Sequence, residues 1–344
     1  MEKIDIKSLS RQELERALEA RGAETYRLAQ IWRWLYKDGG AKSFDVMTDL
    51  PESLRRKLKE GFHITYPVML DAKRSTIDGT TKYLLKLEDA STIETVFLPE
   101  ANRNTVCLST QVGCKFACSF CASAPFGFVR HLKTSEIVDE VLFVKGHNPS
   151  ASITNIVFMG IGEPFDNYDN VIKSIRVLND PDAFNIGARK ITVSTCGLIP
   201  GIRRFAEEGL QVELSVSLHS ADDKVRSHLV PINKRYPLRQ LIAACREYTD
   251  RTNRVITFEY VLIKGANCSR EDALKLARLL KGLKCKVNTI IYNKIRAKGF
   301  AEPSKEDVKV FLATLKESGV HVTNRKSRGE DIDAGCGQLR ISRL

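Results

Sequence analysis

From about residue 100 onward the chain alternates between short apolar runs and helical patterns, and this alternation constrains the fold more than any other feature. The apolar runs predict strands at residues 105–109, 155–159, 190–195, 212–218, 257–263 and 286–292. The stretches between them predict helices at residues 134–146, 168–178, 199–208, 238–249 and 270–283. Repeated strand–helix units form parallel sheets with right-handed crossovers. Six units predict an α/β fold with a partial (β/α)6 barrel, whose functional groups lie at the carboxyl ends of the strands.

The first 100 residues follow two different patterns. Residues 1–60 are predicted to form three helices, one capped by Ser10, one beginning near Tyr26 and one beginning after Pro51. Trp32 and Trp34 in the second helix are either core residues or exposed contacts for nucleic acid. Residues 61–100 alternate with a period of two, which predicts a small antiparallel sheet. The predicted organisation is a helical accessory module at 1–60, a β extension at 61–100, a barrel at 101–330 and a tail at 331–344.

The composition is that of a globular protein of ordinary polarity. Of the 344 residues, 43% are hydrophobic and 28% are charged, and no apolar run reaches membrane-spanning length. The first residues have no apolar signal-peptide core. Nine cysteines without a secretory signal indicate thiol chemistry in a reducing compartment, so we expect a cytoplasmic protein that contacts no membrane.

The charge balance is strongly basic. Fifty-four Lys and Arg residues against 42 Asp and Glu give a net charge of +12. Such a charge favours a polyanionic partner, most simply a nucleic acid. The alternative interpretation is a generally basic surface that aids solubility.

Three cysteines, Cys114, Cys118 and Cys121, follow the spacing C-x3-C-x2-C. Three close thiolates can hold three irons of a [4Fe–4S] cluster and leave the fourth iron open to a substrate. A zinc site would need a fourth Cys or His at finger-like spacing, and His131 lies ten residues further on. A thioredoxin-like pair, Cys118 and Cys121, would leave Cys114 without a role. The spacing therefore favours a cluster over zinc, a redox pair or plain buried thiols.

Polar residues recur where the predicted barrel strands end. Gly160, Gly162 and Glu163 follow the second strand, and the glycines would let the backbone approach a ligand closely. The third, fourth and sixth strands end near Ser194, near Ser217 to His219, and at Asn293. Taken singly, the glycines could form an ordinary turn and the histidine could be structural. Their convergence above the cysteine motif favours a ligand site.

Cys336 lies between two glycines, outside any periodic element. A flexible, polar setting indicates an accessible and reactive thiol. The remaining cysteines outside the motif and the first barrel strand lie in or beside regular elements, so we interpret them as structural. They are Cys196, Cys245, Cys268 and Cys285.

With Phe120 before its third cysteine, the motif resembles the radical S-adenosylmethionine (SAM) signature, and the chain resembles the RlmN/Cfr family of radical SAM RNA methyltransferases. Two departures are visible: Gly335 replaces a frequent alanine, and Pro125 interrupts the loop after the third cysteine. The stretches that carry the resemblance are residues 30–36, 94–96, 107–121, 160–164, 217–219, 230–234 and 336–339.

The resemblance implies a role for each site residue. Cys336 would be methylated by a first SAM, and a second SAM would be cleaved to a radical that activates this methyl group. Cys107 would form a transient disulfide with Cys336 that frees the product, and Glu94 would accept a proton from the substrate. One [4Fe–4S] cluster would bind Cys114, Cys118 and Cys121. SAM would bind Gly162, Glu163, Ser194, Ser217, Leu218, His219 and Asn293.

The resemblance also implies the substrate and partners. We expect a monomer that methylates carbon 2 of adenine in 23S rRNA and in tRNA, supplied with electrons by a donor such as flavodoxin or ferredoxin. One alternative is methylation of carbon 8, as in the antibiotic-resistance branch; the full N-terminal module favours carbon 2. Another is a non-catalytic iron–sulfur protein that binds RNA or senses redox state, against which Cys107 and Cys336 argue.

Overall fold

The computed structural model describes residues 3–37, 39–293, 299–335 and 337–339. Its main element is a ten-stranded sheet with the strand order β14-β13-β12-β11-β10-β9-β6-β5-β4-β3. Across the described ranges, no helix is both long and apolar enough to cross a membrane. The sheet strands are β3 (Val68–Arg74), β4 (Thr81–Lys86), β5 (Thr92–Leu98), β6 (Thr105–Cys107), β9 (Asn155–Phe158), β10 (Ile191–Thr195), β11 (Glu213–Ser217), β12 (Ile256–Leu262), β13 (Cys285–Ile291) and β14 (Val322–Arg325).

The barrel part of the sheet is parallel. Strand β6 and strands β9 to β14 each run parallel to their barrel neighbours. Six of them are the strands expected from the apolar runs, so the α/β partial barrel is confirmed. The seventh, β14, escapes the sequence pattern because its residues Val-Thr-Asn-Arg are mostly polar and none is buried.

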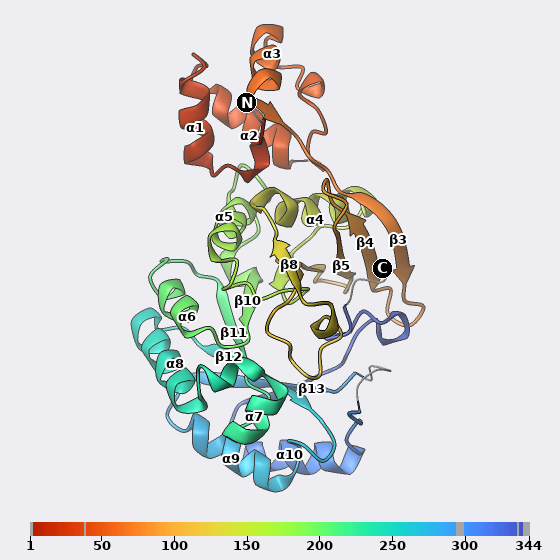
Figure 1. Ribbon diagram of the computed structural model, residues 1–344, viewed down its shortest axis with the longest axis vertical. Helices are drawn as coiled ribbons and strands as arrows, with labels where there is room; N and C mark the ends of the chain where they lie inside the picture. The colour runs from red at the N-terminus through yellow and green to blue at the C-terminus, as the bar shows by residue number, and fades with distance from the viewer. Residues whose placement is uncertain (1–2, 38, 294–298, 336, 340–344) are drawn as a thin grey trace.

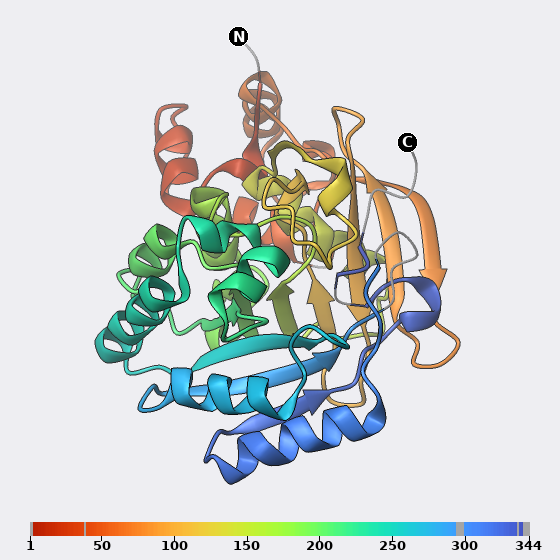
Figure 2. The same ribbon diagram turned by 60° about the horizontal axis from the view of Figure 1, so that its bottom comes forward.

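Helices follow the parallel strands and cover the outer face of the curved sheet (Figures 1 and 2). Two of them, α7 and α10, lie outside the predicted helical stretches. The helices are α4 (Thr134–His147), α5 (Tyr168–Asn179), α6 (Ile199–Phe205), α7 (Asp223–Leu229), α8 (Leu238–Thr252), α9 (Arg270–Leu280) and α10 (Lys305–Glu317). Short 3-10 turns lie at η1 (Ile6–Ser8), η2 (Phe44–Val46), η3 (Ala124–Phe126), η4 (Ala188–Lys190), η5 (Pro231–Lys234) and η6 (Glu330–Ile332).

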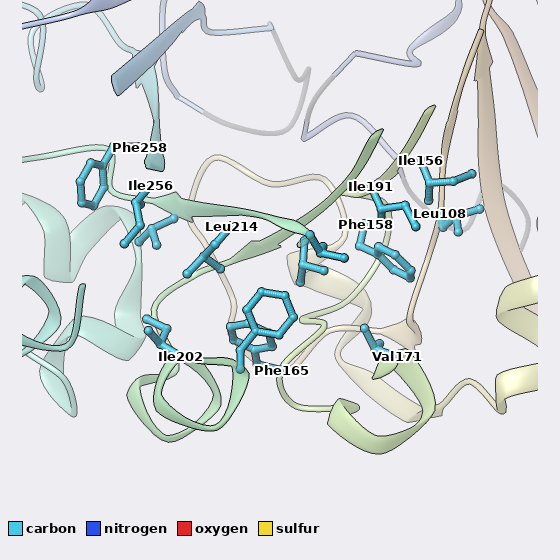
Figure 3. Packing of buried hydrophobic residues seen from close by; sticks show 14 of the residues in the cluster. Leu108, Ile156, Phe158, Phe165, Val171, Ile191, Ile202, Leu214, Ile256 and Phe258 are labelled. Atoms are coloured by element: carbon cyan, nitrogen blue, oxygen red, sulfur yellow. The ribbon is translucent and has the colours of Figure 1, made fainter. Parts of the chain in front are cut away.

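Strand residues that face the helices form the main core. Figure 3 shows Ile156, Ile191 and Leu214, from neighbouring strands, beside Ile202 of α6 and Val171 of α5. All five side chains are fully buried. Because one face of the sheet packs against helices in this way, its other face is left to form the interior of the barrel.

The β extension is not a separate sheet, which corrects the prediction for residues 61–100. Strands β3, β4 and β5 are antiparallel as expected, but β5 also pairs with β6, where Val96 lies opposite Cys107. The five central residues of β5 are buried. A strand buried in this way needs hydrogen-bonding neighbours on both edges, and β6 supplies the second.

The N-terminal module contains the three predicted helices, α1 (Arg11–Glu19), α2 (Arg27–Tyr36) and α3 (Glu52–Gly61). Ser10 caps α1 in a capping box with Glu13. Trp32 is only 1% exposed, so the interpretation of this residue as a surface contact is wrong. The module continues past residue 60, because β2 (Phe62–His63) pairs with β1 (Ile4–Asp5).

A buried ion pair joins this module to the barrel. The ammonium group of Lys7 contacts the carboxylate of Asp139 on α4, and both side chains are at most 2% exposed. Lys7 Nζ also donates to the carbonyl of Thr65 at 2.6 Å. The next residue of α4, Glu140, accepts the backbone N–H of Ser109 at 3.0 Å. One helix therefore contacts both the module and the segment that leads to the cysteine motif.

Candidate active site

A cavity of about 190 Å³ lies between the carboxyl ends of the parallel strands and the loop that carries the three cysteines (residues 114–127, the cysteine loop). Strands β9 to β14 all contribute to its wall. The residues used below that line it are Cys114, Cys118, Phe120, Cys121, Ser123, Gly160, Gly162, Glu163, Ser194, Cys196, Ser217, His219, Glu259, Val261, Arg325, Gly337 and Leu339.

The cysteine loop is held by a hairpin of β7 (Gln111–Gly113) and β8 (Phe128–His131). Gly113 has a φ of 74°, and a Cβ there would collide with the carbonyl of Gly127, the residue before the facing strand β8. Only glycine allows the hairpin to close at this point. The hairpin thus fixes both ends of the loop, and all three cysteines of the motif face the same cavity.

Burial raises the pKa of the Cys114 thiol to about 12 and that of Cys118 well above its usual value. Within the described ranges, no group of three His, Cys, Asp or Glu side chains is already arranged to hold a metal ion. The donor set nevertheless fits three irons of a [4Fe–4S] cluster, since three thiols from one loop face one cavity. A coordinated metal stabilises the thiolate form, which offsets the cost of burial.

The loop after β9 approaches the cysteine hairpin closely. A Cβ on Gly160 would lie 2.6 Å from the carbonyl of Leu108. Gly162 has a φ of 108°, and its Cβ would lie 2.7 Å from Thr110 Oγ1. Both glycines are therefore required for the loop to lie against the β6–β7 segment, and the expected approach of their backbone to a ligand stays a prediction.

Glu163 follows this loop and is 3% exposed. Its carboxylate accepts the backbone N–H of Cys196 at 2.7 Å and that of Phe165 at 3.1 Å. Burial raises the pKa of Glu163, while these hydrogen bonds act in the opposite direction. A cationic ligand group in the cavity would favour the ionised carboxylate further. Cys196, interpreted above as structural, also lines this wall.

The ends of β10 and β11 bring Ser194, Ser217 and His219 to the cavity. His219 has a φ of 57°, and its Nδ1 accepts the N–H of Val261 at 3.0 Å, which places the ring proton on Nε2. Burial, with a smaller effect of Arg226, lowers its pKa to about 3, so the imidazole is neutral near pH 7. Leu218 between them is fully buried in the main core, so its side chain does not line the cavity.

Asn293 lies in a neighbouring cavity of about 560 Å³, which Arg325, Ser327 and Gln338 also line. Its Oδ1 accepts a hydrogen bond from Ser327 at 2.7 Å. Arg325 lines both cavities and so marks their junction. The structure thus brings most expected ligand-binding residues into the first cavity and places Asn293 at its edge.

Two charged residues of the first cavity are absent from the sequence-based prediction, Glu259 on β12 and Arg325 on β14. Glu259 Oε2 lies 3.7 Å from Arg325 Nη1, and Oε1 accepts from Asn288 Nδ2 at 3.1 Å. Burial raises the pKa of Glu259. The signal that could have identified it is the single charged residue in strand 256–262, whose other residues are apolar or, like Thr257, uncharged.

Cys107 lies at the end of β6, where it is 9% exposed and packs in a buried cluster with Val96, Val157, Ala334 and Leu339. Cys336 itself lies outside the described residues. Ala334, two residues before it, and Leu339, three residues after it, belong to the same buried cluster as Cys107. Glu94, on β5, is fully buried and pairs with Lys82 of β4.

The last described segment (residues 328–335 and 337–339, the C-terminal segment) also contacts the cysteine loop. The backbone N–H of Ala122 donates to the carbonyl of Gly337 at 2.7 Å. The hydroxyl of Ser123 donates to the carbonyl of Leu339 at 2.6 Å. Because Gly337 and Leu339 line the cavity, this segment connects the cysteine loop with the surroundings of Cys107.

Comparison with protein families gives two matches. The model described as "Radical SAM superfamily" matches residues 108–292, and that described as "Ribosomal RNA large subunit methyltransferase N-terminal domain" matches residues 4–64. The second match ends within one residue of β2, the last strand of the N-terminal module.

Curated proteins are similar along nearly the whole chain. A protein of Thermoanaerobacter sp. (strain X514) named "Probable dual-specificity RNA methyltransferase RlmN" is 47% identical over 338 residues, covering 98% of this chain and 97% of the relative. A protein of the same name from Geobacillus kaustophilus (strain HTA426) is 45% identical over 337 residues, covering 97% of this chain and 92% of the relative.

A solved structure is also similar along nearly the whole chain. The crystal structure of a radical SAM methyltransferase from Sphaerobacter thermophilus matches with a TM-score of 0.92 and 45% sequence identity. The match covers 98% of this chain and 99% of that protein, so it includes the N-terminal module, the barrel and the β extension.

Proposed function

This chain belongs to the RlmN family of radical SAM RNA methyltransferases, and we propose that it methylates carbon 2 of adenine in 23S rRNA and in tRNA. The match of its N-terminal module to a ribosomal RNA methyltransferase domain supports a ribosomal substrate. The dual specificity in the names of its relatives supports a second RNA substrate.

One observation carries the chemistry of this proposal. Ala334 and Leu339, on either side of Cys336 in the chain, pack in the same buried cluster as Cys107. The same segment lines the cavity of the three cysteines through Gly337 and Leu339. A methyl group carried by Cys336 would therefore have a second thiol and a radical source within one small region.

Adenine carbon 2 needs this arrangement because it lies between two ring nitrogens and is not nucleophilic. It cannot attack the methyl group of SAM directly, whereas a carbon radical can add to it. Cys114, Cys118 and Cys121 would hold the cluster, which would supply the electron for the reductive cleavage of SAM. Gly162, Glu163, Ser194, Ser217, His219 and Asn293 hold SAM beside it; Leu218 sets the spacing of its neighbours from within the core.

The chain's own residues perform the remaining steps. Cys336 Sγ takes a methyl group from a first SAM, and a hydrogen atom is removed from this methyl group at the expense of a second SAM. The carbon, still bonded to Sγ, then adds to carbon 2 of adenine, and Glu94 accepts the proton that carbon 2 loses. Cys107 attacks Cys336 Sγ as a thiolate, so an S–S bond forms as the S–C bond to the product breaks. The released methylene carbon takes up a proton to become the methyl group, and the unpaired electron of the adduct passes to a one-electron acceptor, a role that the bound cluster would supply.

The basic chain and its N-terminal module hold the RNA, whose target adenine must leave its stack to reach the cavity. An electron donor such as flavodoxin or ferredoxin would reduce the cluster, and a dithiol reductant would return the disulfide to two thiols. We propose that the protein acts in the cytoplasm, where both RNAs are found, and that it acts as a monomer.

Methylation of carbon 8 is the second candidate, because both branches of the family share the paired cysteines. The complete N-terminal module favours carbon 2. A non-catalytic iron–sulfur protein is the third candidate; the burial of Cys107 beside the neighbours of Cys336 favours catalysis over it.

The deciding experiment is anaerobic reconstitution with iron, sulfide, SAM and total RNA, followed by mass spectrometry of the nucleosides. We expect 2-methyladenosine from the wild type and none from Cys336→Ala, which should retain its cluster. Detection of 8-methyladenosine instead would establish the second candidate, and a reduced protein that cleaves no SAM would establish the third.

A further inference from the structure

Lys82 of β4 is a buried lysine whose partners come from two distant parts of the chain. Only 6% of the residue is exposed. Its Nζ donates to the carbonyl of Asp333 at 2.9 Å and lies 3.3 Å from Glu94 Oε1. Burying an ammonium group is costly unless hydrogen bonds and an opposite charge compensate for it. The ammonium group of Lys82 therefore needs both contacts, and it links the carbonyl of Asp333 to the carboxylate of Glu94.

The sheet places this cation in line with Cys107. Lys82 lies opposite Val96 on β5, and Val96 lies opposite Cys107 on β6. Side chains directly opposite one another share a face of the sheet, and Glu94 shares it because it lies two residues from Val96. Lys82, Glu94 and Cys107 therefore occupy one face, the face against which the C-terminal segment packs.

The hairpin formed by β3 and β4, which carries Lys82, also contacts the start of the C-terminal segment. Figure 2 shows this segment in blue beside the orange strands. Arg328 donates to the carbonyl of Asp78 at 2.8 Å, and the N–H of Gly329 donates to Asp78 Oδ2 at 3.0 Å. The N–H of Thr76 donates to Asp331 Oδ2 at 3.1 Å. Lys82 then holds Asp333, three residues before Cys336. The β3–β4 hairpin is thus the support on which this segment is laid.

We propose that Lys82 is a positioning residue for methyl transfer. It sets the distance between the C-terminal segment and the carboxylate of Glu94. This inference rests on the proposed function, in which the adduct on Cys336 must present carbon 2 to Glu94. The carbonyl of Asp333 and the carboxylate of Glu94 both contact Lys82 Nζ. If either group moved away from the other, one of these two buried contacts would break. Lys82 itself touches neither SAM nor the cluster in this role.

The test compares Lys82→Met, which removes the charge at similar volume, with Lys82→Arg, which keeps it. Lys86→Met is the matched control, because Lys86 lies on the same strand and is exposed. Reconstituted proteins are assayed for iron content, 5′-deoxyadenosine formed and methylated adenine formed. We expect Lys82→Met to bind iron and cleave SAM like the wild type but to make at least tenfold less product per SAM cleaved. Lys82→Arg should recover part of this ratio, and Lys86→Met should match the wild type.

A second readout separates positioning from a merely structural effect. With RNA deuterated at adenine carbon 2, product formation by Lys82→Met should show a larger isotope effect than the wild type, because proton transfer to Glu94 becomes slower. An unchanged product ratio together with an unchanged isotope effect would overturn the proposal. If Lys82→Met does not fold, Lys82→Gln decides by the same criteria. A wild type that makes no methylated adenine would instead count against the proposed function.

Discussion

The hydroxyl of Ser123 donates a 2.6 Å hydrogen bond to the carbonyl of Leu339, which joins the cysteine loop to the C-terminal segment. Ser123 is two residues beyond Cys121, and Leu339 is three residues beyond Cys336. Both residues are buried. The position of the chain around the proposed methyl carrier is therefore linked to the loop that would hold the cluster.

Ser123→Ala should weaken this link. It leaves the buried carbonyl of Leu339 without this donor, at a cost of about 1–3 kcal/mol. We expect methylation of Cys336 to slow by roughly tenfold, in line with about 1.4 kcal/mol, while iron content stays at the wild-type level. Mass spectrometry of the peptide that contains Cys336 measures this. The control is Ser119→Ala in the same loop, whose hydroxyl lies 3.5 Å from its acceptor; equal rates for the two variants would refute the link.

Cys107→Ala should trap the reaction at the covalent stage. Without this thiol nothing breaks the bond between Cys336 sulfur and the product, so the protein should remain attached to RNA. We expect a shifted band on a denaturing gel that nuclease digestion removes, and no turnover. Cys285→Ala, at the opposite end of a barrel strand, should give neither effect. Free methylated product without a shifted band would remove Cys107 from the mechanism.

Gly160→Ala should displace the loop that carries Glu163. The added Cβ would lie 2.6 Å from the carbonyl of Leu108 and 2.8 Å from the nitrogen of Ser109, and neither backbone atom can move freely. We expect a loss of about 1–3 kcal/mol in unfolding free energy and roughly tenfold weaker SAM binding. Denaturant titration and equilibrium dialysis measure these quantities. Gly187→Ala is the control, since its nearest atom would lie 4.0 Å away. Unaltered SAM binding by Gly160→Ala would separate this loop from the SAM site.

Asp78→Asn should show how far the ionised carboxylate of Asp78, which accepts from Gly329 of the C-terminal segment, contributes to the free energy of unfolding at each pH. Partial burial opposes the ionised carboxylate of Asp78, but hydrogen bonds from Thr80 and Gly329 and the charge of Arg328 outweigh it and lower the pKa to about 2. A depressed pKa stabilises the fold above the unfolded value of 3.8, and the stabilisation is lost as the pH falls through 2.

With allowance for solvent screening, we expect the unfolding free energy of the wild type to exceed that of Asp78→Asn by roughly 1 kcal/mol near neutral pH. The difference between their urea unfolding free energies should be constant above about pH 4 and should close toward pH 2. A difference that does not depend on pH across this range would mean that the charge of Asp78 is not what stabilises the contact.

The barrel strands could be predicted because they are short apolar runs covered on both faces. All four residues of β9, for example, are buried. The edge strands gave no such signal. Six of the seven residues of β3 are exposed, and β14 has no buried residue, so neither forms an apolar run. Their place in the sheet depends on pairing with neighbours, which a local pattern does not contain.

The cysteine motif was predictable because its three thiols lie on one loop. Contacts between distant segments were not: Lys82 and Asp333 are 251 residues apart, and nothing local to either residue indicates the other. Arg325 escaped for the same reason, since it lies on an edge strand far along the chain from the rest of the site, whereas Glu259 carries a local signal in its own strand. Asn293 was expected beside SAM, and it lines the neighbouring cavity.

The buried pair of Lys7 and Asp139 affects how this enzyme can be divided. Asp139 and Glu140 are consecutive residues of α4, one bound to the N-terminal module and the other to Ser109. Removal of residues 3–63 would leave the buried carboxylate of Asp139 without its partner Lys7. Asp139 lies on α4, the helix that also contacts Ser109 in the segment before the cysteine loop. The two regions that family comparison separates are thus joined through α4, so we expect that neither would fold stably without the other.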